Sequence, residues 1–171
     1  MGLLQPHAGH RRGDGAARLT PAKAAGGTTG TTTGRAVSVL GHAQARVAVA
    51  AAAAAGAPIT LISACGAAAF AGPGWFQGLV AALRREWPDT GISAILDCGD
   101  MPGHALAALR HGIDTIRYNG PAAAQIADIA RQCNATVLRE RPQALDLAAL
   151  DENLESACRA WFDSATRDSE Y

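Results

Sequence analysis

The sequence predicts a single α/β domain built on about five parallel strands that alternate with helices. Two observations carry this prediction. Short runs of β-branched and aliphatic residues alternate with longer alanine- and leucine-rich stretches over residues 36–164, which is the order of repeated β-α units. The strand runs are apolar throughout, and such runs are typical of parallel strands covered on both faces. The domain is therefore expected to be a parallel sheet between helices.

Its first half contains three predicted strands and two helices. Gly56, with Pro58 just beyond it, ends the first helix, and Trp87-Pro88 ends the second. The predicted elements are a strand at 36–40, a helix at 42–55, a strand at 59–63, a helix at about 75–86 and a strand at 92–97.

The second half repeats the same alternation. Pro102 and Pro121 suit the first turn of a helix, because proline lacks the N–H that is unpaired there. The predicted elements are a helix at 102–111, a strand at 114–118, a helix at 121–132, a strand at 135–139 and a last amphipathic helix at about 146–164.

Two strand orders fit this pattern. One is an open, doubly wound, flavodoxin-like sheet, and the other is a partial (βα) barrel in which strands adjacent in sequence are also adjacent in space. The short unit between Gly99 and Gly120 favours the barrel. The single-domain length favours the open sheet, and we expect the open sheet.

The two ends of the chain differ from the domain. Residues 1–35 are rich in glycine and threonine, without helical or strand periodicity, and predict a disordered basic tail. Residues 165–171 are expected to be flexible. The formal net charge of the whole chain is zero, and acidic residues predominate after Leu145. Because no basic patch lies within the domain, we expect no nucleic-acid partner.

The composition also bears on location. No charged residue lies between Arg46 and Arg84, but Gly56 and Pro58 interrupt this stretch and alanine is only weakly apolar. We therefore expect no membrane association. The four cysteines form no CxxC pair and no apolar leader precedes them, which favours free thiols in the cytoplasm.

Polar residues and glycines follow most of the predicted strands. Because parallel strands end at one edge of the sheet, where helix N-termini present unpaired N–H groups, ligands bind at this carboxyl edge. We expect a small anionic metabolite there, and Arg141 could add positive charge. The candidate ligand-binding residues are Ser63, Gly66, Asp97, Gly99, Asn119, Gly120 and Arg139.

The candidate catalytic residues are Asp97, Cys65, His42 and His104. A cysteine with a histidine base would suit nucleophilic catalysis, but no catalytic motif fixes a reaction, so enzymatic activity and cofactor stay open. Cys65, Cys98 and the two histidines match no metal-ligand spacing, and no metal is expected. The alternative function is a non-catalytic regulatory or assembly module that acts through the last helix, for example by forming a homo-oligomer.

Overall fold

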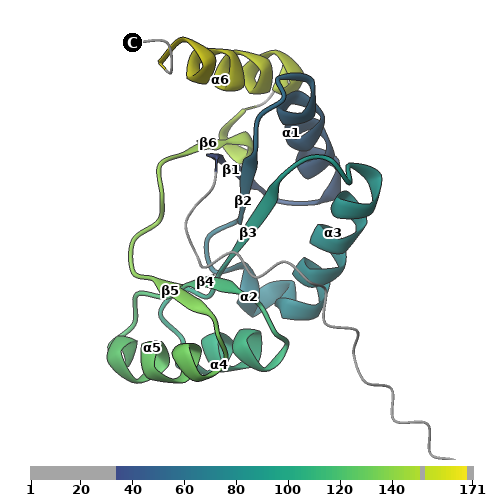
Figure 1. The fold of residues 1–171 in the computed structure, drawn as a ribbon. Coiled ribbons are helices and arrows are strands. Elements are labelled where there is room, and N and C mark those ends of the chain that lie inside the picture. The colour runs from purple at the N-terminus through teal and green to yellow at the C-terminus, as the bar shows by residue number, and fades with distance from the viewer. Residues whose placement is uncertain (1–33, 151–152, 169–171) are drawn as a thin grey trace, which may run out of the picture.

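The computed structural model describes residues 34–150 and 153–168, without the side chains of 165–168. The strands are β1 (Arg35–Val39), β2 (Ile59–Ser63), β3 (Ile92–Asp97), β4 (Thr115–Arg117), β5 (Thr136–Leu138) and β6 (Ala144–Asp146). The helices are α1 (His42–Ala54), α2 (Ala67–Phe70), α3 (Gly72–Glu86), α4 (Pro102–Arg110), α5 (Ala123–Gln132) and α6 (Leu154–Asp168), with a 3-10 turn, η1 (Leu147–Ala149). Figure 1 shows their arrangement.

The strands form one parallel sheet in the order β5-β4-β3-β2-β1-β6. The α/β class and the parallel sheet are confirmed. The flavodoxin-like order is wrong, because it requires β1 between β2 and β3, whereas β2 lies between β1 and β3. From β1 to β5, neighbours in sequence are neighbours in the sheet, which is the order of the alternative, a partial (βα) barrel.

The helices cover one face of the sheet. Right-handed crossovers that advance in a single direction place every helix on the same side, and neighbouring helices contact one another in the series α6, α1, α3, α4, α5. Figure 1 shows this layer curving around the sheet, with the β5–β6 connection on the opposite side. The expectation of helices on both faces is therefore also wrong.

Chain connectivity requires the sheet to curve. Leu138 and Ala144 are six residues apart, which allows a reach of about 21 Å. In a flat sheet β5 and β6 would stand about 24 Å apart across five strand spacings. The edges must therefore bend towards each other. Curvature also explains why the strands are apolar on both faces, because Ile62 and Ile95 pair in register and are buried without belonging to the core beneath the helices.

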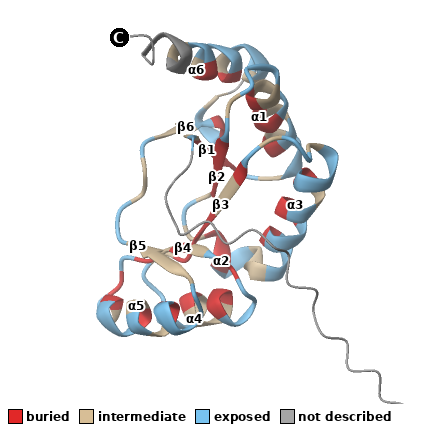
Figure 2. Cartoon of the chain, in the orientation of Figure 1, coloured by how far each residue is buried: buried red, intermediate tan, exposed pale blue. Residues whose placement is uncertain are grey.

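Buried residues concentrate in the strands and on the helix faces turned towards them (Figure 2). In α1, Ala45, Ala48 and Ala52 are fully buried, and α6 packs on this helix through Cys158 and Phe162. The alanines allow α1 to lie close to both the sheet and α6. This double contact accounts for its apolar sequence.

The largest error in the predicted elements concerns the last helix. Residues 144–149 form β6 and η1, and α6 begins at Leu154. Asn153 has a φ of 61°, a left-handed conformation that interrupts a helix. At the start of α4, Asp100 has the residue type that suits an N-cap, but Met101 holds that position and no side chain caps it.

The predicted tail lies outside the described residues, apart from Gly34 and Arg35, and Arg35 already belongs to β1. Of the predicted flexible end at 165–171, residues 165–168 continue α6, so the helix extends beyond the predicted boundary at 164, and residues 169–171 lie outside the described residues. Within the described part of the chain, no helix combines the length and the apolar character needed to cross a bilayer.

Candidate functional site

Asp97 lies at the carboxyl end of β3 and is fully buried. Its Oδ1 accepts hydrogen bonds from the backbone N–H groups of Gly66, at 3.0 Å, and Gly99, at 2.9 Å. Its own N–H donates to the Ser63 hydroxyl oxygen at 2.9 Å. A buried carboxylate needs such partners, because the loss of its hydration otherwise costs a free energy on the order of several kcal/mol. The loops after β2 and β3 therefore form a cradle for this carboxylate.

Arg141 reaches Asp97 from the connection between β5 and β6. One guanidinium nitrogen donates to Asp97 Oδ2 at 2.7 Å. The other donates to the Ser38 hydroxyl at 2.9 Å and to the Ser63 carbonyl at 2.8 Å. Arg141 thereby joins this connection to the ends of β1, β2 and β3.

Arg117 approaches the same carboxylate from β4. It pairs in register with Asp97, so both side chains project from the same face of the sheet. Its guanidinium lies 3.4 Å from Asp97 Oδ1. The Arg117 Nε–H is buried and has no acceptor within the described part of the chain. We call Asp97, Arg117 and Arg141 the Asp–Arg centre.

The Asp–Arg centre carries excess positive charge. Two guanidinium groups share one carboxylate, and arginine stays protonated at all ordinary pH values. The side chain of Asp97 is fully buried, whereas those of Arg141 and Arg117 remain 28 % and 15 % exposed. The arginines therefore form the solvent-facing side of the centre. That side can attract an anion.

Glycines shape the loops around the centre. Gly66 and Gly99 have φ values of 64° and 61°, which turn their N–H groups towards Asp97 and which side chains rarely adopt. Gly120 is buried, and a Cβ placed there would lie 2.2 Å from the Asp100 carbonyl oxygen and 2.3 Å from the Tyr118 hydroxyl. The loops after β3 and β4 thus meet at a position that only glycine fits.

The structure brings together Ser63, Gly66, Asp97 and Gly99 of the predicted ligand-binding residues. Asn119 is exposed, and its backbone N–H donates to the Gly99 carbonyl. Gly120 acts through the loop packing described above, and Arg139 is an exposed residue of the same connection as Arg141. Of these residues, Asp97 alone contributes a side-chain carboxylate to the centre.

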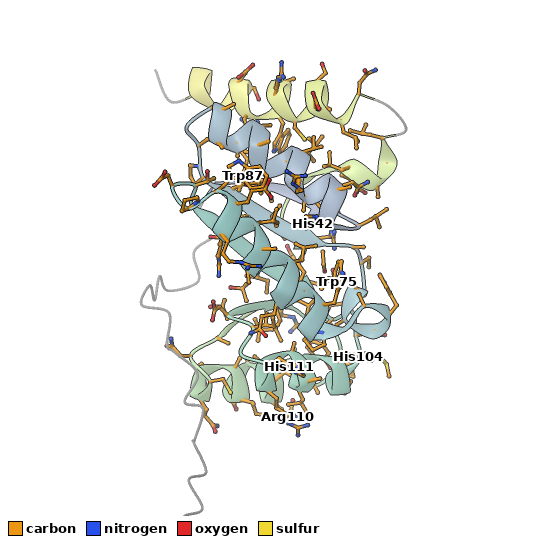
Figure 3. All side chains as sticks on the ribbon, turned by 90° about the vertical axis from the view of Figure 1, so that its right-hand side faces the viewer. His42, Trp75, Trp87, His104, Arg110 and His111 are labelled. Carbon is orange, nitrogen blue, oxygen red and sulfur yellow. The ribbon has the colours of Figure 1, made fainter. Side chains whose placement is uncertain are left out.

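The candidate catalytic residues do not converge on a nucleophile and a base. In Figure 3, His42 and His104 project from different helices, α1 and α4. Cys65 is exposed. Burial, with a smaller contribution from the charge of Asp97, raises the pKa of the neighbouring Cys98 to about 12, so its thiol stays protonated near neutral pH. Within the described residues, no three His, Cys, Asp or Glu side chains gather to hold a metal ion.

The sequence reasoning missed Arg117 and Ser38. The signal for Arg117 was a charged residue between the apolar Ile116 and Tyr118, inside a predicted strand. Ser38 gives no comparable signal, because a serine in an apolar strand is common, and only its contact with Arg141 sets it apart.

Two surface hollows lie away from the Asp–Arg centre. One lies at the amino ends of β2 and β3, next to Pro58, Trp87 and Gly91. The other lies between α1 and α6, next to Arg46 and Arg159. The charged side chains that line them, among them Arg46, Glu155 and Arg159, are exposed, in contrast to the fully buried Asp97. The centre remains the better candidate site because its buried charges meet at the edge where parallel sheets bind ligands.

Compared with known proteins, the chain matches no family model and no curated protein. The class is therefore defined by fold and site alone. It is a parallel β/α sheet with barrel-like strand order from β1 to β5, and it carries a buried carboxylate held by two arginines at the carboxyl edge.

Proposed function

We propose that this protein binds a small anionic metabolite at the carboxyl edge of its sheet, against Arg117 and Arg141. The observation that carries the proposal is the convergence of two guanidinium groups on the single buried carboxylate of Asp97. Counting the three groups gives one uncompensated positive charge. A carboxylate or phosphate is the group that such paired guanidiniums recognise best.

Asp97 has a positioning role in this proposal. Its contacts with Gly66 and Gly99 anchor it in the loops, and its bond to Arg141 fixes that guanidinium in place. A fixed arginine loses less conformational entropy when an anion binds than a free side chain would.

The geometry favours ligand binding over the alternative of a module that acts through its last helix. The buried side chains of α6, Cys158 and Phe162, pack against α1 of the same chain. The exposed residues of its described surface include Glu155, Arg159 and Asp163, which do not form an apolar docking face. We also propose a cytoplasmic location, supported by four unpaired cysteines.

The test is a thermal-shift screen followed by calorimetric titration. The panel contains inorganic phosphate, citrate and simple monocarboxylates. A ligand at one hundred times its Kd stabilises the folded state by about 2.7 kcal/mol, which raises Tm by roughly 5–11 °C for a chain of this length. We expect at least one anion of the panel to stabilise the protein.

The matched variants are Arg117→Gln and Arg46→Gln. Arg117→Gln removes the uncompensated charge and should weaken anion binding at least tenfold. Arg46 forms a surface ion pair with Glu86 between α1 and α3, away from the centre, so Arg46→Gln should bind like the parent. If no anion stabilises the parent, or if both variants bind equally well, the proposal fails.

A further inference from the structure

Exposed large hydrophobic side chains occur in the segments that follow the strands around the Asp–Arg centre. The described part of the chain exposes four of them, Leu40, Phe70, Trp75 and Met101, by 53 %, 70 %, 38 % and 56 %. Each follows the carboxyl end of a strand: Leu40 follows β1, Phe70 and Trp75 follow β2, and Met101 follows β3. Scattered exposed apolar residues are ordinary, so only those that lie close to the centre bear on what it binds.

Three of these side chains lie next to groups that contact the centre. Leu40 is two residues beyond Ser38, which accepts a hydrogen bond from Arg141. Met101 is two residues beyond Gly99, which donates to Asp97. Two residues span at most about 7 Å, so both side chains begin close to the centre.

Phe70 is joined to the centre through α2. Gly66, which donates to Asp97, is the N-cap of α2, and Phe70 is the last residue of that helix, about 6 Å further along its axis. The loops of Gly66 and Gly99 are themselves adjacent, since a Cβ on Gly99 would lie 3.9 Å from the Cα of Gly66. We call Leu40, Phe70 and Met101 the apolar rim.

The loops that hold the Asp–Arg centre thus also carry exposed apolar side chains. We propose that the anion bound at the Asp–Arg centre carries an apolar body, such as an acyl chain, which lies against the apolar rim. This inference rests on the proposed function and narrows its ligand to amphipathic anions. The head group contacts Arg117 and Arg141, and the body covers side chains that otherwise remain in water.

A small molecule fits these dimensions better than an extended partner. The rim residues come from three neighbouring loops around one charged pair, and β1, β2 and β3 together span about 10 Å. This distance matches a chain of about eight carbons. Trp75 lies further along the chain, in α3. None of the residues described above as contacting the Asp–Arg centre lies close to Trp75 in sequence. Trp75 is therefore left out of the rim and serves as a control.

The experiment measures Kd by calorimetry for acetate, butyrate, hexanoate and octanoate, with inorganic phosphate as a purely hydrophilic anion and octanamide as a neutral analogue. We expect affinity to rise roughly two- to fourfold for each added methylene that is buried. Octanamide should bind at least tenfold more weakly than octanoate, because it lacks the charge that the arginines recognise.

The variant Phe70→Ser/Met101→Ser tests the rim, and Trp75→Ser is its control. Both replaced rim side chains are exposed, so the fold should tolerate the change. The ratio of octanoate to acetate affinity should fall towards one in the rim variant and stay at the parent value in Trp75→Ser. Light scattering on the same samples reports the oligomeric state.

Each contrary outcome has a distinct meaning. Equal affinity for phosphate, acetate and octanoate overturns the inference and leaves the proposed function standing. If octanoate and octanamide bind with equal affinity and Arg117→Gln leaves that affinity unchanged, both this inference and the proposed function are overturned. If the rim variant changes the molecular mass in solution but not the affinity ratio, the rim is a surface for self-association and the inference is wrong.

Discussion

Replacing Asp97 with asparagine is the most informative single change. The asparagine side chain would keep nearly the same shape, and its amide oxygen can still accept the N–H groups of Gly66 and Gly99. Its amide nitrogen would then face Arg141, where the carboxylate oxygen now accepts a hydrogen bond at 2.7 Å. Two donors would meet, and both arginines would lose their shared counter-charge.

The expected cost follows from burial. Removing one partner of a fully buried ion pair costs about 3–5 kcal/mol. Arg141 and Arg117 keep 28 % and 15 % exposure, so water can partly solvate them after the change. We therefore expect the lower end of that range, about 3 kcal/mol. For a chain of 171 residues this lowers Tm by roughly 6–12 °C.

Urea and thermal unfolding followed by circular dichroism measure this loss. The control is Asp128→Asn, which removes an exposed ion pair with Arg131 one helical turn away and should cost less than about 1 kcal/mol. A loss for Asp97→Asn no greater than that of the control would refute the reasoning, because Asp97 would then not hold the carboxyl edge together.

Three further predictions concern backbone packing and the cysteines. Gly120→Ala should destabilise the fold by about 1–3 kcal/mol in urea unfolding, because the added Cβ would clash with the loop after β3. The control is Gly103→Ala in α4, where a Cβ has nothing near it, and this change should be neutral or stabilising. Stability should fall as pH rises from about 9 towards about 12, because burial raises the pKa of the Cys98 thiol in the folded state and the unfolded chain loses this proton first. Cys98→Ala should flatten this dependence of stability on pH in alkaline unfolding curves. An unchanged slope would contradict the raised pKa. In the native state a thiol reagent should label the exposed Cys65 and Cys133 quickly and the two buried thiols slowly, and four equal rates by mass spectrometry would contradict the packing.

Local signals predicted most of the elements. The strands at 59–63 and 92–97 match β2 and β3 in full, and α1 and α4 each end one residue before the predicted end. These segments combine an unbroken apolar run with a glycine or proline at the boundary, so that propensity and turn chemistry agree. By contrast, β6 contains three residues and runs directly into the apolar stretch that follows, and its last residue, Asp146, caps η1 and also suits the start of a helix. The local pattern therefore favoured a helix.

The site was predictable in its place but not in its contacts. A carboxylate at the end of a buried strand already required partners, and the sequence placed Asp97 there. The pairing of β3 with β4, which brings Arg117 into register with Asp97, is common to both strand orders. The order decides the neighbour on the other side of β3. Because β2 lies there, Ser63 reaches Asp97, whereas in the flavodoxin-like order β1 would separate the two residues.

The sequence by itself determined the α/β class, the alternation of its elements and the edge where charged residues meet, because these depend on local periodicity and on the common direction of parallel strands. Only the tertiary structure decided the strand order, the single helical layer and the joining of Arg141 to Asp97 across 44 residues of chain. The physical reason is that strand order depends on long-range packing and on the reach of the short connection between β5 and β6, and neither has a local signature in the sequence.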